Sequence, residues 1–309
     1  MIINDVHSRL NPTVPGRLVR VDSLPSLRAA VVEARGSRVS VAGGRHAMGG
    51  QQFTSGGTVL DTRSLARVLH LDLRRGLVEV EAGIQWPQLV AHLLAAQRGC
   101  RRQWGIAQKQ TGANYFTIGG SVSANCHGRG LGMAPIVTDV ESLRLVQADG
   151  SVVVCSRGRN PELFRLVIGG YGLFGAIYSV TLRLAPRTKL ERVVDVISVA
   201  QLMDEVPERI SAGFRYGDFQ FAIDPVSPDF LHKGVFSCYR PVDSDRPIPA
   251  DQRVLSPKDW QSLLVLAHAE KSRAFDEYAR HYLATSGQLY WSDLHQLAVY
   301  LDDYHHALD

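Results

Sequence analysis

The sequence is poor in cysteine, in net charge and in long apolar runs, and each shortage excludes a class of protein. Its cysteines form no CxxC pair, and their spacing matches no zinc signature. The four are Cys100, Cys126, Cys155 and Cys238. We therefore expect reduced thiols and no metal site, and the simplest location for such a chain is the cytoplasm.

Charge and hydropathy exclude two further kinds of partner. The chain has 34 Lys and Arg residues against 30 Asp and Glu residues, a net charge of +4 over 309 residues. A net charge this small argues against binding of nucleic acid, and the chain has no dense stripe of Lys and Arg with aromatic residues between them. The longest uncharged run, residues 166–182, contains four glycines, so we expect no membrane span. Residues 1–16 also lack the apolar stretch of a secretory signal.

Glycine is scarce in one part of the chain and dense in the other. Of the 28 glycines, 24 lie at or before Gly175, which marks a boundary near Pro186. The 45% hydrophobic and 21% charged residues are typical of an ordered globular protein, and the length predicts about two domains. Dense glycine indicates either backbone that approaches a ligand closely or a loop-rich β domain with many tight turns.

Hydropathy patterns predict an α+β arrangement with hairpins, because strands and helices do not alternate regularly. In the first part they indicate strands at residues 38–42, 58–60, 77–82, 140–146, 151–155 and 176–184, and helices at 24–34, 86–96 and 160–167. Asn160 is expected to cap the last of these helices. In the second part they indicate strands at 193–197, 219–223 and 234–239, a helix at 199–209 and a helix-rich tail from residue 260.

The first glycine segment, AGGRHAMGGQ at residues 42–51, directly follows a predicted strand. Small residues in a row expose successive backbone N–H groups, which can hold a phosphate. His46 lies inside the segment, and its imidazole could contact a cofactor or bond to it covalently. The alternative is a turn in which the histidine only caps backbone groups.

The second and third segments, TGANYFTIGG and SVSANCHGRG, occupy residues 111–130 without a break. They are too rich in glycine for an ordinary helix, and they offer hydroxyl, amide and N–H groups in turn. Such a stretch can lie along an extended polar ligand. The alternative is a buried loop that satisfies its own polar groups.

The fourth segment, GGYGLFG at residues 169–175, contains a GxGxxG match at residues 170–175. A Rossmann site requires a strand before this fingerprint and a helix after it. Here a helix precedes it and a strand follows, so we reject a nicotinamide dehydrogenase. We expect a turn that brings residues 175–177 near a ligand.

Together these ordered motifs resemble the FAD-binding domain of the vanillyl-alcohol oxidase superfamily, the PCMH-type flavoproteins. The resemblance covers residues 14–186. The superfamily includes aldonolactone oxidases, 6-hydroxynicotine oxidase and decaprenylphosphoryl-ribose oxidase, and the layout is closest to the sugar-alcohol and decaprenylphosphoryl-ribose type branch. It implies a two-subdomain FAD-binding fold over residues 12–188, followed by a partial α+β substrate (cap) domain over residues 189–309. Family members are usually longer, so the chain is expected to be shortened after its predicted helical end at residues 305–309.

The resemblance also implies the residues that would hold FAD. Residues 41–51 would wrap the diphosphate, residues 112–120 would continue toward the ribityl chain, residues 124–127 would line the flavin, and Ile177 would lie near the adenine. The expected contacts are Val41, Ala42, Gly43, Gly44, Arg45, His46, Ala47, Met48, Gly49, Gly50, Gln51, Gly112, Thr117, Ile118, Gly119, Gly120, Ala124, Asn125, Cys126, His127 and Ile177. His46 matches the residue to which many members attach FAD, although some relatives bind it without a bond.

The implied function is an FAD-dependent oxidoreductase that oxidises a C–OH group of a sugar-like or alcohol substrate by hydride transfer to flavin N5. Its partners would be a small-molecule substrate and an electron acceptor such as oxygen, and an open apolar face in the tail would favour a homo-oligomer. The catalytic base is not identified. Tyr290, Asp293 and His295 are candidates, and an ordinary helix with solvated polar groups is the alternative. The alternative function is a truncated FAD-binding protein with little or no catalysis.

Overall fold

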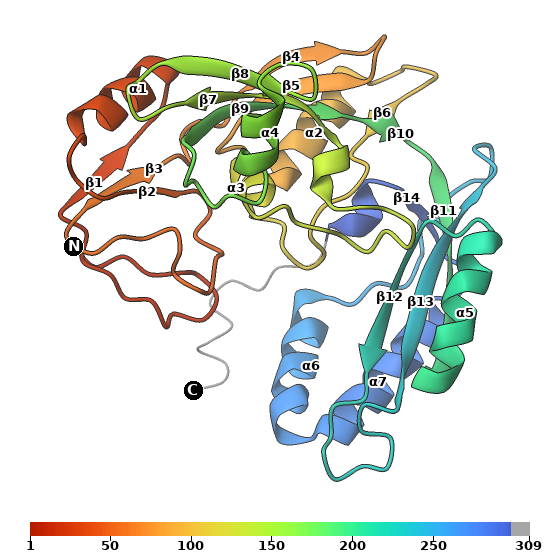
Figure 1. The fold of residues 1–309 in the computed structure, drawn as a ribbon. Coiled ribbons are helices and arrows are strands. Elements are labelled where there is room, and N and C mark those ends of the chain that lie inside the picture. Colours follow the sequence, from red (N-terminus) through yellow and green to blue (C-terminus); the bar gives the residue numbers. More distant parts are fainter. Residues whose placement is uncertain (298–309) are drawn as a thin grey trace. The chain divides into compact units, whose positions relative to one another are not determined.

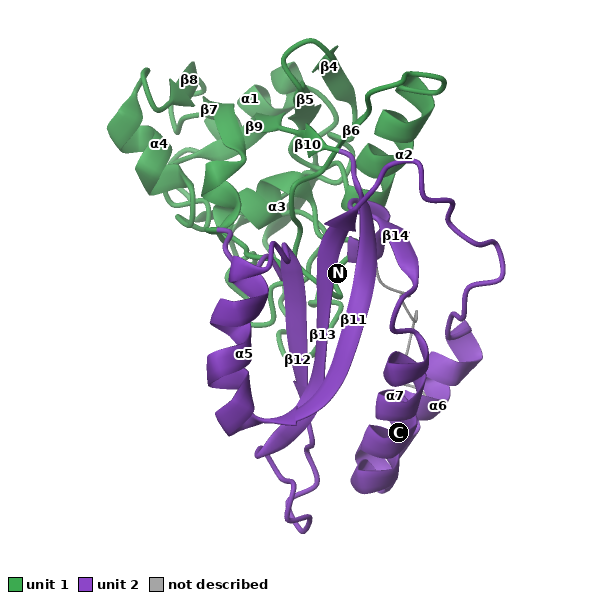
Figure 2. Ribbon diagram, turned by 90° about the vertical axis from the view of Figure 1, so that its right-hand side faces the viewer, with its two compact units in different colours: residues 1–128, 134–186 green, residues 129–133, 187–309 purple. Residues whose placement is uncertain are grey.

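The computed structural model describes residues 1–297, and the chain divides into two compact units (Figure 2). Unit 1 contains residues 1–128 and 134–186. Unit 2 contains residues 129–133 and the chain from residue 187 onward. The chain therefore passes from one unit to the other three times.

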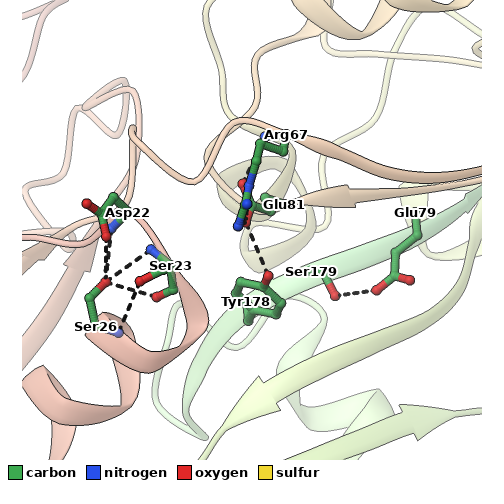
Figure 3. Close-up of polar contacts among 8 residues, drawn as sticks. All are labelled: Asp22, Ser23, Ser26, Arg67, Glu79, Glu81, Tyr178 and Ser179. Atoms are coloured by element: carbon green, nitrogen blue, oxygen red, sulfur yellow. Dashed lines mark hydrogen bonds and ion pairs between the residues drawn. The ribbon is translucent and has the colours of Figure 1, made fainter.

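Unit 1 begins with a three-stranded parallel sheet in the order β1-β3-β2 (Figure 1). Its strands are β1 (Arg17–Arg20), β2 (Val39–Ala42) and β3 (Thr58–Asp61), and α1 (Leu24–Glu33) connects the first two. Central β3 is buried along its whole length, as expected of a parallel strand. Ser23 caps α1 through a reciprocal capping box with Ser26 (Figure 3), which satisfies backbone N–H groups at the start of the helix.

A second, antiparallel sheet completes the frame of unit 1, with the order β4-β5-β9-β7-β8. Its strands are β4 (Val68–Asp72), β5 (Leu77–Glu81), β7 (Val140–Val146), β8 (Val152–Ser156) and β9 (Ala176–Arg183). The short elements of this unit are α2 (Trp86–Ala96), β6 (Trp104–Gly105), α3 (Ile118–Ser123), the 3-10 helix η1 (Ile136–Thr138), α4 (Pro161–Val167) and β10 (Ala185–Pro186). Strand β9 lies between two hairpins and joins segments that are far apart in sequence.

A buried carboxylate ties this sheet together (Figure 3). Glu81 on β5 is fully buried and accepts hydrogen bonds from the Arg67 side chain at 2.8 Å and from the Tyr178 hydroxyl on β9 at 3.2 Å. Two residues earlier in the same strand, Glu79 accepts from the Ser179 hydroxyl at 2.7 Å. A buried charge is tolerated only when it is paired in this way, so these bonds also fix the register between β5 and β9.

Unit 2 is built on an antiparallel sheet in the order β12-β13-β11-β14. Its elements are β11 (Lys189–Ser198), α5 (Val199–Ser211), β12 (Tyr216–Phe221), β13 (Lys233–Val242), α6 (Pro257–Ala269), α7 (Lys271–Ala284), β14 (Leu289–Trp291) and the 3-10 helix η2 (Leu294–Gln296). Figure 2 shows α5 on one face of the sheet and α7 on the other. Residues 129–133 lie along β12, where Leu131 N–H donates to the Arg215 carbonyl and Gly217 N–H donates to the Arg129 carbonyl.

Most predicted elements are present, with ends shifted by a few residues, but one local prediction is wrong. Residues 118–123 form helix α3 despite two glycines, because Thr117 caps the helix and Gly119 packs on Ala82. Asn160 occupies the N-cap position of α4, as expected, although its side chain donates to the Val154 carbonyl and does not bond to the helix. The tail is helix-rich, as expected, since it contains α6 and α7 as well as the short strand β14. The predicted helical end at residues 305–309 lies outside the described residues.

Candidate functional site

All four glycine segments meet at one cavity in unit 1. The cavity holds about 1000 Å³, including the part open to solvent. Its walls come from the loop after β2, from α3 and the residues around it, and from the turn before β9, with single residues contributed by the ends of β3 and β5. The mixed apolar and polar lining suits an organic ligand that carries polar groups.

The loop after β2 has room only for glycine at two positions. A Cβ atom on Gly43 would lie 2.2 Å from the Thr117 hydroxyl oxygen, and one on Gly44 would lie 2.4 Å from the Tyr115 carbonyl oxygen. Within residues 1–297, the backbone N–H groups of Gly43, Gly44, Arg45 and Ala47 form no hydrogen bond. Successive N–H donors of this kind, at the wall of a cavity, form a site for an anion.

Arg45 adds a cationic side chain to the same wall. It has a left-handed backbone, with φ of 62°, and its guanidinium pairs with Asp61 at 3.1 Å. Burial raises the pKa of Asp61, but hydrogen bonds from Arg63 outweigh burial, so the net shift is downward and the carboxylate is charged. Two buried side-chain atoms at this wall, Arg45 Nε and Gln52 Oε1, have no hydrogen-bond partner in the described chain. Unsatisfied buried groups are costly, which favours a polar ligand here.

Helix α3 is anchored against the sheet so that its first turn borders the cavity. The Thr117 hydroxyl accepts from Gly120 N–H at 3.2 Å, and Gly119 N–H donates to the Ala82 carbonyl at 2.8 Å. Buried Ser121 accepts from the Trp86 indole N–H at 3.2 Å. Cys126 follows the helix, and burial raises the pKa of its thiol, which therefore stays protonated at neutral pH.

His46 lies at the cavity wall, half-buried between two rings. Its Nδ1 is 2.8 Å from Nε2 of His7, and its ring centroid is 4.7 Å from that of Phe116. Burial lowers the pKa of His46 to about 4, and repulsion from His7 acts in the same direction. The imidazole is therefore neutral at physiological pH.

The structure places thirteen of the residues expected to contact FAD at this cavity. They are Val41, Gly43, Gly44, Arg45, His46, Ala47, Gln51, Thr117, Gly119, Gly120, Ala124, Cys126 and Ile177. The eight others lie off its lining: Ala42, Met48, Gly49, Gly50, Gly112, Ile118, Asn125 and His127. Two of these have evident reasons, because Ile118 is fully buried in the core and Met48 is 62% exposed. For all of them, contact with FAD remains a prediction.

Nine lining residues are absent from the expected FAD contacts, although two of them, Gly175 and Ala176, belong to the turn at residues 175–177 that was expected near a ligand. The nine are Gln52, Thr62, Ala82, Phe116, Ser123, Tyr171, Gly172, Gly175 and Ala176. Phe116, Ser123 and the turn residues 171–176 lie in or beside the glycine segments, so reading those segments without gaps would have found them. Thr62 and Ala82 follow ordinary strands, and only the tertiary fold brings them to the site.

The three candidate bases lie in unit 2, where they are not the solvated residues of a helix. Asp293 is 1% exposed, and its carboxylate accepts from Arg187 Nε at 2.8 and 3.0 Å. His295 packs against the ring of Tyr239 at 4.7 Å. The Tyr290 ring lies 4.6 Å from the Arg192 guanidinium. The helical alternative is therefore wrong, whereas a role as base remains a prediction.

Two further surveys cover the described part of the chain. No group of three or more His, Cys, Asp or Glu residues there is arranged to hold a metal ion. Among residues 1–297, no helix combines the length and the apolar character needed to cross a bilayer.

Comparison with known proteins gives this cavity a chemical context. Residues 15–156 match the family model of an FAD binding domain. The chain is 28% identical over 243 residues to L-gulono-1,4-lactone dehydrogenase of Mycobacterium tuberculosis, covering 78% of this chain and 53% of that protein. It is 28% identical over 190 residues to L-gulonolactone oxidase of Bos taurus, covering 60% of this chain and 41% of that protein. An oxidoreductase of the fasciation locus of Rhodococcoides fascians is 34% identical over 182 residues, covering 59% and 39%. The chain thus spans about half the length of the curated relatives it matches, or less.

Proposed function

We propose that this chain binds FAD in the cavity of unit 1 and acts as an FAD-dependent oxidoreductase on a C–OH group, because residues 15–156 match the family model of an FAD binding domain. The observation that carries the proposal is the convergence of all four glycine segments on that one cavity. A sugar lactone is the substrate class that the names of the relatives support.

The residues at the cavity fit the cofactor. A diphosphate needs several hydrogen-bond donors, and the N–H groups of residues 43–45 and 47 supply them without charged side chains. Arg45 Nε is one more donor, and Gln52 Oε1 is an acceptor for a ribityl or ribose hydroxyl. Apolar surface from Phe116 and Ile177 suits the flat rings at either end of FAD.

When bound, FAD supplies the hydride acceptor, and the protein supplies binding and orientation. The glycine loop and α3 hold the cofactor through backbone groups that are fixed before it binds, so little further ordering is needed. Neutral His46 and the protonated thiol of Cys126 add no charge to the cavity. Proton removal from the substrate hydroxyl then depends on a base that the residues of unit 1 described above do not provide.

Uptake of FAD and its reduction by substrate separate this proposal from the alternative of an FAD-binding protein without catalysis. The purified protein is expected to be yellow, or to become so on addition of FAD. Anaerobic addition of an aldonolactone such as L-gulono-1,4-lactone is expected to bleach the flavin absorbance. A yellow protein that no lactone or sugar alcohol bleaches would support the alternative, and a protein that takes up no FAD would contradict both.

We also propose that His46 is the attachment point of covalent FAD. A neutral imidazole at the cavity wall has one unprotonated nitrogen that can act as a nucleophile, which supports the assignment, and the hydrogen bond that this nitrogen accepts within the protein must break before it bonds to FAD. After acid precipitation, the flavin colour is expected to remain in the pellet of the wild-type protein and to appear in the supernatant of His46→Ala. Release from the wild type would leave His46 as a non-covalent contact.

The remaining parts of the proposal concern the cellular compartment, the electron acceptor and the oligomeric state. The four cysteines are free thiols, which supports a reducing compartment such as the cytoplasm. Oxygen or another oxidant would reoxidise the flavin. Association into a homo-oligomer stays a proposal, to be tested by the mass of the purified protein in solution.

A further inference from the structure

The first thirteen residues form a closed loop that the glycine segments do not include. Backbone hydrogen bonds join Ile3 and Thr13 in both directions, at 2.9 and 2.8 Å. Inside the loop, the carboxylate of Asp5 accepts from Ser8 N–H at 2.6 Å and from the Asn11 amide at 2.8 Å. Burial of Asp5 opposes its charge, but these bonds outweigh it and lower the pKa of Asp5 to about 2. The loop is therefore a preformed structure rather than a loose end.

This N-terminal loop, residues 3–13, packs on the glycine loop through three polar contacts. Val6 N–H donates to the Arg45 carbonyl at 2.9 Å, and the Asn11 amide donates to the Met48 carbonyl at 2.7 Å. The third contact joins His7 Nε2 and His46 Nδ1 at 2.8 Å. The Val6 and Asn11 hydrogen bonds hold the loop on either side of His7, so they fix the backbone that carries the His7 ring.

A carbonyl group on the other side of the His46 ring indicates which of the two ring nitrogens carries the proton. The Tyr115 carbonyl accepts a hydrogen bond from the His46 ring. A Cβ atom placed on Gly44 would lie 2.4 Å from the Tyr115 carbonyl oxygen and 3.3 Å from His46 Nε2. The oxygen is therefore on the Nε2 side of the His46 ring. A carbonyl oxygen can only accept, so the nitrogen facing it must carry hydrogen. Nδ1 of neutral His46 is then the unprotonated nitrogen, and His7 must be the donor in the contact between the rings.

We propose that His7 is the positioning residue of His46: it donates from Nε2 to His46 Nδ1 and holds His46 as the Nε2–H tautomer, with its ring fixed at the wall of the cavity. The contact of His46 with Phe116 limits rotation in the remaining direction. The tautomer is a property of the protein alone. Its consequence for cofactor binding rests on the FAD site proposed above.

Nitrogen NMR of protein labelled with 15N-histidine tests the tautomer without FAD. In the wild type, His46 Nε2 is expected to show the shift of a protonated nitrogen and Nδ1 that of an unprotonated one. His7→Phe keeps a ring but removes the donor, which leaves the Tyr115 carbonyl alone to favour Nε2–H, and it is expected to raise the share of the Nδ1–H tautomer. His7→Gln restores an N–H donor and is expected to recover the wild-type pattern. His92→Gln, an exposed change on α2, is the matched control and is expected to alter nothing.

Titration of apoprotein with FAD provides the second readout. His7→Phe is expected to bind FAD roughly fivefold more weakly, the effect of one ordinary hydrogen bond, with His7→Gln close to the wild type. A wild-type His46 protonated on Nδ1, or a His46 pattern unchanged in His7→Phe, would overturn the proposal. If the tautomers behave as expected but no variant binds FAD, the failure lies with the FAD site and not with the role of His7.

Discussion

Replacing Asp293 by asparagine is expected to lower the free energy of unfolding of unit 2 by about 3–5 kcal/mol. Asp293 and Arg187 form an ion pair in which the side chains are only 1% and 8% exposed. Both carboxylate oxygens accept from Arg187 Nε, and the guanidinium also lies 4.1 Å from the centre of the Trp291 ring. The substitution removes the carboxylate charge that this buried guanidinium faces, and the loss of that attraction is the main source of the destabilisation.

Chemical denaturation followed by tryptophan fluorescence measures this loss. The matched control is Asp229→Asn, which breaks an ion pair with Lys233 at 3.1 Å whose side chains are 44% and 42% exposed. Exposed pairs contribute about 0–1 kcal/mol, so the control should remain close to the wild type. Equal losses in the two variants would contradict a structural role for the Arg187–Asp293 pair.

Replacing Gly43 by alanine is expected to weaken FAD binding at least about tenfold, or ~1.4 kcal/mol. The new methyl group would lie 2.2 Å from the Thr117 hydroxyl, so one of the two segments must shift. The shift also disturbs the cap of α3, because the same hydroxyl accepts from Gly120 N–H. Loss of such a cap alone costs about 1 kcal/mol. The backbone donors of the glycine loop would no longer face the cofactor as a set.

Flavin fluorescence during titration of the apoprotein measures the affinity, and circular dichroism checks that the variant is folded. Gly158→Ala is the control, because a Cβ there meets no atom within 4 Å and the residue lies outside the cavity lining. A folded Gly43→Ala protein that binds FAD as tightly as the wild type would place the diphosphate elsewhere.

The sequence predicted those parts of the site whose geometry depends on the local backbone. Dense glycine beside a histidine predicted the cavity-lining loop, because only glycine can pack as closely as Gly43 and Gly44 do. The order of helix and strand around residues 170–175 correctly excluded a Rossmann site. Both inferences rely on neighbours in the sequence, and local patterns report these well.

Features that depend on contacts between residues far apart in the chain could not be predicted from the sequence. Two glycines argued against a helix at α3, but packing of Gly119 on Ala82 requires the small residue and overrides its low helix propensity. His7 lies 39 residues from His46, and no periodic pattern joins them. Asp293 looked like a solvated residue because its partner Arg187 is 106 residues away. In each case the missing information was a tertiary contact.

The short excursion of residues 129–133 into unit 2 bears on how such a protein can be inherited. A gene fragment that ends at residue 186 would encode this segment without Arg215 and Gly217, whose backbone groups it bonds. Because neither unit is continuous in sequence, recombination that exchanges a single block of the gene cannot transfer unit 1 alone to another protein. The segment would lose its partners in such a transfer, so the two units are expected to have been inherited together.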